Sequence, residues 1–241
     1  MPHTKKRFQS PGNRILRALP EADLQRLTPH LTSISLDLRQ SVFKAERPIK
    51  QVCFPDSGVC SVMSVMRSGA IAEVATVGNE GVLGLVLFFG QNAEPTNAIV
   101  QVPGAGRIMP ADVFVKEMER KSELHRILGY YAHARMVQVM QTAACNQLHS
   151  LERRICKWIL MTHDRVAGDD FTLTHEFLSL LLGARRPTVT SIARKLQDGG
   201  LIEYRHGRVT VLNRKTLERA ACECYETTRD YSEQFLKRLP R

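Results

Sequence analysis

The sequence predicts an α+β protein, with an N-terminal β-roll, a long central helix and a C-terminal domain of two short helices and a hairpin. Three observations predict this order. Short segments rich in Val, Ile and Phe, separated by turn residues, fill residues 36–108, as in a roll or barrel. A proline-free run of about 28 residues then extends from Ser122 to His149, which is long for a globular helix. Two striped helical segments and a hairpin pattern occupy residues 174–212.

The composition limits the class of protein. Of 241 residues, 34 are Lys or Arg and 24 are Asp or Glu, a net charge of +10 that permits a polyanionic partner. No apolar run is long enough to span a membrane, and residues 1–20 lack the apolar core of a secretory signal, so we expect a cytoplasmic protein without membrane contact. Residues 1–20 carry five basic side chains and no acidic one, which favours a flexible basic arm.

The length favours more than one domain. We expect the basic arm at 1–20, a β-roll domain at 21–121, a long helix at 122–149 and a further domain of helices and a hairpin at 150–241. No histidine occurs between Leu36 and Ile108, which disfavours a metal-dependent enzyme on the roll, and no G-x-S-x-G motif marks a hydrolase. We therefore expect no enzymatic activity.

The central helix carries one continuous apolar stripe. Its members step by three and four positions and include Leu124, Ile127, Leu128, Tyr131, Ala134, Val137, Met140, Ala144 and Leu148. A long helix with a single stripe usually packs against a twin. The stripe therefore predicts a homodimer through residues 122–149.

The segment after Leu173 has the local signals of a helix-turn-helix. Thr174 is suited to cap the first helix and Gly183 to end it, while Pro187 fits the first turn of the second helix. Two short strands around a turn at residues 205–207 follow, and they predict a basic wing. Residues 216–239 favour a further helix, packed on the wing or on a partner subunit.

The six cysteines are scattered along the chain, at positions 53, 60, 145, 156, 222 and 224. In a cytoplasmic protein this favours reduced, buried thiols. No C-x-x-C pair is present, and Cys222-x-Cys224 is tighter than the usual zinc spacing, so no metal site is expected.

Four segments resemble the Crp/Fnr family of bacterial transcription regulators: residues 173–202, 52–63, 77–84 and 142–160, within a similarity that spans about residues 20–215. The resemblance implies a roll of the cyclic-nucleotide-binding type (a double-stranded β-helix), a dimer helix and a winged helix-turn-helix. It also implies that a homodimer binds double-stranded DNA and that RNA polymerase is a partner.

Two departures concern the ligand. Family members that bind cyclic nucleotides carry a Gly-Glu turn and an Arg-Ser pair that holds the cyclic phosphate. At these two positions this chain has Gly84-Leu85 and Pro95-Thr96. Because the arginine of that pair is missing here, a cyclic phosphate would lose a charge-assisted hydrogen bond, so cyclic AMP is not expected to bind. The resemblance places the family's ligand pocket at Gly84, Leu85, Thr96, Asn97, Val139 and Met140, and here it takes either a less polar ligand or none. No cysteine precedes Cys53, so the iron–sulfur cluster of Fnr-type sensors is not expected, and no cofactor is assigned.

The second helix is expected to read DNA in the major groove. Candidates for base contacts are Arg186, Pro187, Thr190, Ser191 and Arg194. Candidates for phosphate contacts are Thr174, Arg185, Thr188, Lys195, Arg205 and Arg208. The predicted function is a sequence-specific transcription regulator on a near-palindromic operator, modulated by a signal at the roll. The alternative is a ligand-sensing module that acts through protein partners without DNA.

Overall fold

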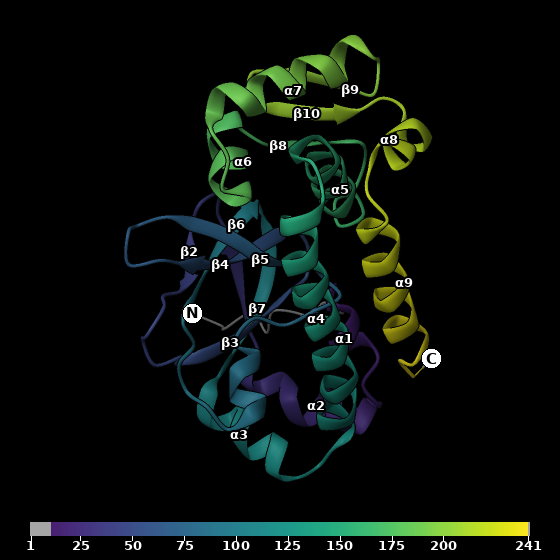
Figure 1. Ribbon diagram of the computed structural model, residues 1–241. Helices are drawn as coiled ribbons and strands as arrows, with labels where there is room; N and C mark the ends of the chain where they lie inside the picture. Colours follow the sequence, from purple (N-terminus) through teal and green to yellow (C-terminus); the bar gives the residue numbers. More distant parts are fainter. Residues whose placement is uncertain (1–10, 241) are drawn as a thin grey trace, which may run out of the picture.

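The computed structural model describes residues 11–240 and has the predicted fold class (Figure 1). A β-roll is followed by one long helix, α4, and by a C-terminal domain of helices and a small sheet. None of the helices among the described residues is long and apolar enough to cross a membrane.

The roll consists of two antiparallel sheets with strand orders β1-β7-β3 and β2-β6-β4-β5. Its strands are β1 (Thr32–Leu36), β2 (Ser41–Phe43), β3 (Gln51–Pro55), β4 (Val59–Val65), β5 (Ile71–Val77), β6 (Thr96–Val102) and β7 (Gly104–Pro110). Buried Leu36, Cys53, Val62 and Val100 pack in its core. Gly58, with φ +79°, lets the chain turn where any Cβ would lie 2.6 Å from the Val102 carbonyl oxygen.

Residues 11–20 do not form part of the flexible arm that the charge of residues 1–20 predicts. Residues 1–10 of that arm lie outside the described residues. The rest forms α1 (Arg14–Arg17), in which Ile15 and Leu16 are fully buried. Buried Asn13 caps this helix through Oδ1 and donates from Nδ2 to the carbonyl oxygens of Pro55 and Gly81. The apolar side chains and this anchor outweigh the local positive charge. Two short helices follow, α2 (Glu21–Leu27) and η1 (Thr28–His30).

Helix α4 (Glu123–Leu148) runs along the roll, after η2 (Leu85–Phe89) and α3 (Ala111–Glu119). Leu124, Ile127, Leu128 and Tyr131 are buried within their own chain, so the first half of the predicted dimer stripe does not face a partner. The large apolar residues that remain exposed on this helix, Met136, Val139, Met140 and Leu148, lie in its second half.

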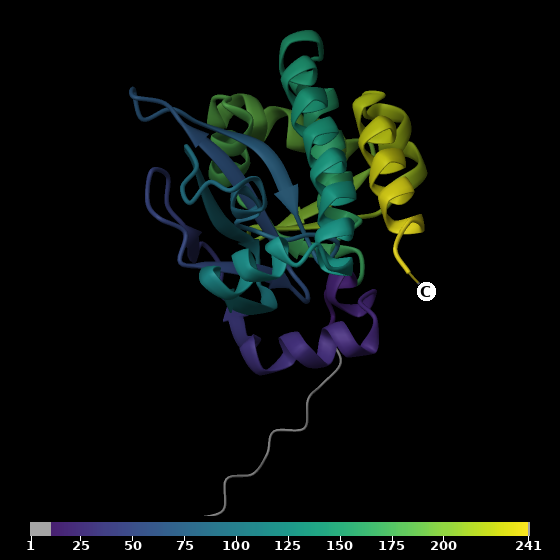
Figure 2. The same cartoon turned by 90° about the horizontal axis from the view of Figure 1, so that it is seen from below.

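The C-terminal domain contains α5 (Leu151–His163), β8 (Asp170–Thr172), α6 (His175–Leu182), α7 (Arg186–Asp198), β9 (Ile202–Arg205), β10 (Arg208–Val211), α8 (Arg214–Ala220) and α9 (Cys224–Lys237). Its sheet has the order β8-β10-β9. The single helix expected at 216–239 is two helices. The second, α9, lies side by side with α4 of the same chain rather than on the wing (Figures 1 and 2). Phe235 of α9 packs against Tyr131 of α4.

The roll and the C-terminal domain share one apolar core. Val59, Met63 and Val102 of the roll pack in the same cluster as α5, α6 and the wing. Polar contacts cross this interface as well: the Trp158 indole donates to Glu73 over 3.1 Å, and Gln101 donates to the Thr162 hydroxyl over 2.9 Å. The position of α7 is therefore set by the roll as well as by its own domain.

Candidate DNA interface and ligand cavity

The helix-turn-helix is built by local capping. The Thr174 hydroxyl accepts a hydrogen bond from the Phe177 amide over 3.1 Å and so caps α6. Gly183, at φ +61°, ends that helix in the left-handed conformation. Pro187 lies in the first turn of α7, where its missing N–H costs nothing. Buried Val189 and Leu196 then anchor α7, so its opposite face is turned outward.

The candidates for base contacts gather on that outward face. Arg186, Pro187, Ser191 and Arg194 are exposed, and within residues 11–240 neither Arg186 nor Arg194 forms an ion pair. Thr190 differs, because it is half-buried and its hydroxyl lies 3.0 Å from His175 Nδ1. Its hydroxyl is already engaged within the protein, whereas the other four side chains are available to a ligand.

The candidates for phosphate contacts surround this face in two groups. Arg185 and Thr188 are exposed beside the start of α7, and Thr174 is half-buried at the start of α6. The other three form exposed ion pairs within the chain: Lys195 with Glu152 at 2.8 Å, Arg205 with Glu203 at 2.7 Å, and Arg208 with Asp170. Exposed pairs contribute only about 0–1 kcal/mol, so a phosphate can replace the carboxylate.

A contact between α6 and the wing was not expected from the sequence. The His175 ring stacks on Tyr204 with centroids 4.1 Å apart, and the Tyr204 hydroxyl donates to the Leu173 carbonyl oxygen over 2.6 Å. Burial, and then the charge of Arg186, lower the pKa of His175 and favour the neutral imidazole. The two residues are 29 positions apart (204 − 175), so no local spacing signals this contact.

The wing ends in a two-residue turn. His206 and Gly207 have φ of +47° and +75°, and the flanking Arg205 and Arg208 are paired across the hairpin. Positive φ at both positions matches the twist of a tight hairpin. This turn holds both arginines, exposed, at the tip of the wing.

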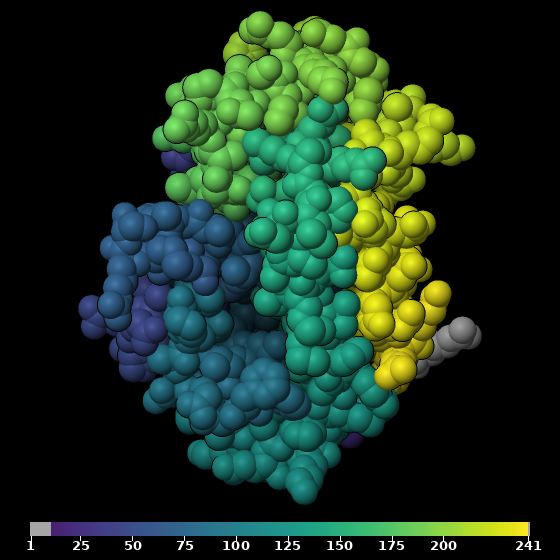
Figure 3. Space-filling view, viewed as in Figure 1, coloured from purple at the N-terminus to yellow at the C-terminus, as the bar shows by residue number. Residues whose placement is uncertain are grey.

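A cavity of about 610 Å³ lies between the roll and α4, where Figure 3 shows a hollow. Gly84, Leu85, Val139 and Met140, four of the six predicted pocket residues, line it. Thr96 and Asn97 do not: Thr96 donates to Glu94, and the Asn97 side chain accepts from the Ala45 amide over 2.7 Å. Both side chains form hydrogen bonds within the roll instead of lining the cavity. The sequence does not indicate these contacts.

The cavity wall is mainly apolar, with Phe43, Phe88 and Met136 among its side chains. Its charged or titratable members are Glu94, His133 and Arg135. Burial raises the pKa of Glu94. The Arg135 guanidinium already donates to the Thr76 carbonyl oxygen and to Gln138. Such a wall suits a largely apolar ligand better than a phosphodiester.

The six cysteines are free and buried, as expected. Although the cysteines are scattered along the sequence, three of them, Cys145, Cys222 and Cys224, meet in space next to His149. The hydrogen bond between the thiols of Cys145 and Cys222 lowers the pKa of Cys222 and raises the pKa of Cys145. These four residues are a set that could hold a metal ion, which the spacing of the cysteines did not indicate.

Comparison with known proteins matches residues 153–220 to the Crp-like helix-turn-helix domain, whereas no curated protein sequence matches the chain. Similar solved structures include FixK2 from Bradyrhizobium japonicum (15% identity, TM-score 0.68, covering 80% of this chain and 98% of that one). A transcriptional regulator of the CRP family from Thermus thermophilus is also similar (20%, 0.66, 78% and 96%). So is the c-di-GMP-responsive global regulator CLP of Xanthomonas campestris (16%, 0.62, 80% and 100%). The predicted resemblance is confirmed in the fold and in the helix-turn-helix domain.

Proposed function

We propose that this chain, a DNA-binding transcription regulator of the Crp/Fnr type, acts as a homodimer on a near-palindromic operator. The observation that carries the proposal is the outward face of α7. It presents Arg186, Ser191 and Arg194 beside the basic wing, with both arginines outside any ion pair among the described residues. A guanidinium at the start of a recognition helix can bond guanine O6 and N7 together.

The exposed apolar face of α4 supports the homodimer. Met136, Val139 and Met140 are 54%, 40% and 55% exposed, although each is apolar. Val139 and Met140 lie three and four positions after Met136, so all three share one side of α4. Exposed apolar side chains grouped on one helix are typical of a helix–helix seam. Two α7 helices related by a two-fold axis would then read half-sites about 34 Å apart, one turn of DNA.

The cavity beside α4 supports control by an effector. We propose that it takes a largely apolar ligand rather than cyclic AMP, because its wall offers mainly apolar side chains and its arginine is already hydrogen-bonded within the chain. An apolar fluorescent dye should bind the protein, and Leu85→Arg, which puts a charge on the cavity wall, should abolish its binding. Unchanged dye binding by that variant would contradict the assignment of the cavity.

Contact with RNA polymerase remains a prediction of the resemblance alone. The absence of enzymatic activity and a cytoplasmic location likewise follow from the type of protein, and we include them in the proposal on that ground.

DNA selection from random sequence by the purified protein tests the function. We expect a near-palindromic site to be enriched. Arg186→Ala should cost about 1–3 kcal/mol on that site and relax the preference at one base pair in each half-site. Failure to enrich any sequence, or an equal loss of affinity on operator and random DNA, would refute the role given to α7.

A further inference from the structure

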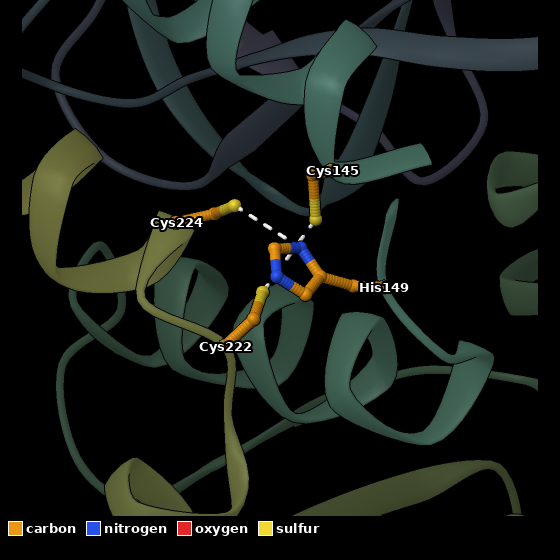
Figure 4. A group of neighbouring side chains, drawn as sticks. All are labelled: Cys145, His149, Cys222 and Cys224. Atoms are coloured by element: carbon orange, nitrogen blue, oxygen red, sulfur yellow. Dashed lines mark hydrogen bonds between the residues drawn. The ribbon is translucent and has the colours of Figure 1, made fainter. Parts of the chain in front are cut away.

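Four side chains from two distant parts of the chain meet where α4 ends (Figure 4). Cys145 belongs to the last turns of α4, and His149 is the residue that follows the helix. Cys222 lies between α8 and α9, and Cys224 begins α9. The three sulfur atoms and one ring nitrogen all lie within 4.8 Å of one another.

The spacing of these atoms is close to that of a tetrahedral ligand set. The sulfur atoms of Cys145 and Cys222 are 3.5 Å apart, and Cys224 Sγ lies 3.4 Å from His149 Nδ1. Zinc bonds of about 2.3 Å to sulfur and about 2.0–2.1 Å to nitrogen place two sulfurs about 3.8 Å apart and a sulfur and a nitrogen about 3.6 Å apart. These two pairs therefore need little movement to bind one ion, and the whole set lies within 4.8 Å.

Hydrogen bonds from two neighbouring side chains orient two of the four ligands. Glu223 accepts from His149 Nε2 over 3.1 Å, which leaves the Nδ1 lone pair directed at the cluster. A carboxylate that holds the far nitrogen of a ligating histidine is a recurrent partner in zinc sites. Gln141 Nε2 donates to Cys224 Sγ over 3.1 Å, a bond that stabilises a thiolate.

The site is closed. The three cysteines are between 0% and 3% exposed, and they form a small cluster of their own, apart from the larger apolar cores. Four protein ligands without an open position are typical of structural zinc rather than of catalytic zinc. Ligands of an iron–sulfur cluster bind separate iron atoms, whereas these four ligand atoms all lie within 4.8 Å of one another.

We propose that Cys145, His149, Cys222 and Cys224 bind one Zn²⁺ ion in tetrahedral coordination. The ion joins the C-terminal end of α4 to the turn that begins α9. It thereby fixes the start of α9 against the end of α4. The ligand His149 directly precedes Ser150, which caps α5, the first helix of the C-terminal domain.

Metal analysis of the purified full-length chain tests the proposal directly. We expect one zinc per chain, and Co²⁺ in its place should give the thiolate charge-transfer bands and intense d–d bands of a tetrahedral site. A double variant, Cys145→Ser with Cys222→Ser, should lose the metal and these bands. Cys60→Ala, which removes a buried thiol of the roll, is the matched control and should keep both.

An exposed pair of carboxylates keeps the test independent of folding. The side chains of Glu223 and Glu226 on the same surface are 68% and 70% exposed, and only Glu223 contacts His149. Glu223→Gln should weaken Zn²⁺ binding by about 10–100-fold in competition with a chromophoric chelator, whereas Glu226→Gln should leave it unchanged.

Four results would overturn the proposal. The reduced protein could take up no zinc, or the double variant could retain as much metal as the native chain. The freshly isolated protein could show the absorption of an iron–sulfur cluster. It could instead carry a disulfide between Cys145 and Cys222 and no metal.

Discussion

Replacing Val139 with Asp should dissociate the proposed dimer. Val139 is 40% exposed in the single chain, so a partner helix would bury less than half of its side chain. Full burial of Val contributes about 1.5–3 kcal/mol, which scales to roughly 1 kcal/mol per subunit here. The substitution removes this contribution twice and places a carboxylate at the seam of each subunit, at a further cost of about 1–3 kcal/mol each.

The sum, about 4–8 kcal/mol, corresponds to a dimer dissociation constant at least about a thousandfold higher. Sedimentation velocity across a range of protein concentrations measures this change. Ser33→Asp, at an exposed position of β1, adds the same charge away from α4 and should leave the dimer intact. A Val139→Asp protein that sediments like the native dimer at every concentration would refute the seam.

Three further predictions concern DNA, ligand and pH. Arg208→Ala should weaken binding to all DNA sequences alike and reduce the salt slope by about one per subunit, and a selective loss on the operator would contradict its role as a phosphate contact. Calorimetry with cyclic AMP should show no binding, and a micromolar dissociation constant would refute the apolar assignment of the cavity. Burial raises the pKa of Glu73 above its ordinary 4.5, so the folded state holds that proton more tightly than the unfolded chain does. The free energy of unfolding should therefore fall as the pH rises from about 4.5 through the raised pKa. Urea titrations should show a smaller fall for Glu73→Gln than for the native chain. Identical pH profiles for the two proteins would contradict the assignment.

Local chemistry made the helix-turn-helix predictable from the sequence. A cap at Thr174, a left-handed residue at Gly183 and a proline in the first turn at Pro187 each act within a few positions of the chain. The outward face of α7 follows from the buried positions of Val189 and Leu196. Signals of this kind need no knowledge of distant contacts.

Contacts between distant segments explain what the sequence did not predict. Periodicity identifies the apolar side of α4 but not its neighbour, so Leu124 and Tyr131 were assigned to a partner although their own chain covers them. Cys145 and Cys222 are separated by 77 positions and belong to no spacing motif, so only the fold brings them to 3.5 Å. The packing of α9 against α4 creates that encounter.

The wall of the ligand cavity and the proposed dimer seam have three residues in common, Met136, Val139 and Met140. An effector bound in the cavity would therefore touch side chains that a second subunit at the proposed seam would also touch. Thermodynamic linkage makes this coupling reciprocal: if the effector changes the association constant of the subunits by some factor, association changes the affinity for the effector by the same factor. The apparent effector affinity of this protein should consequently depend on its own concentration, so that the cellular abundance of the chain sets its sensitivity to the signal.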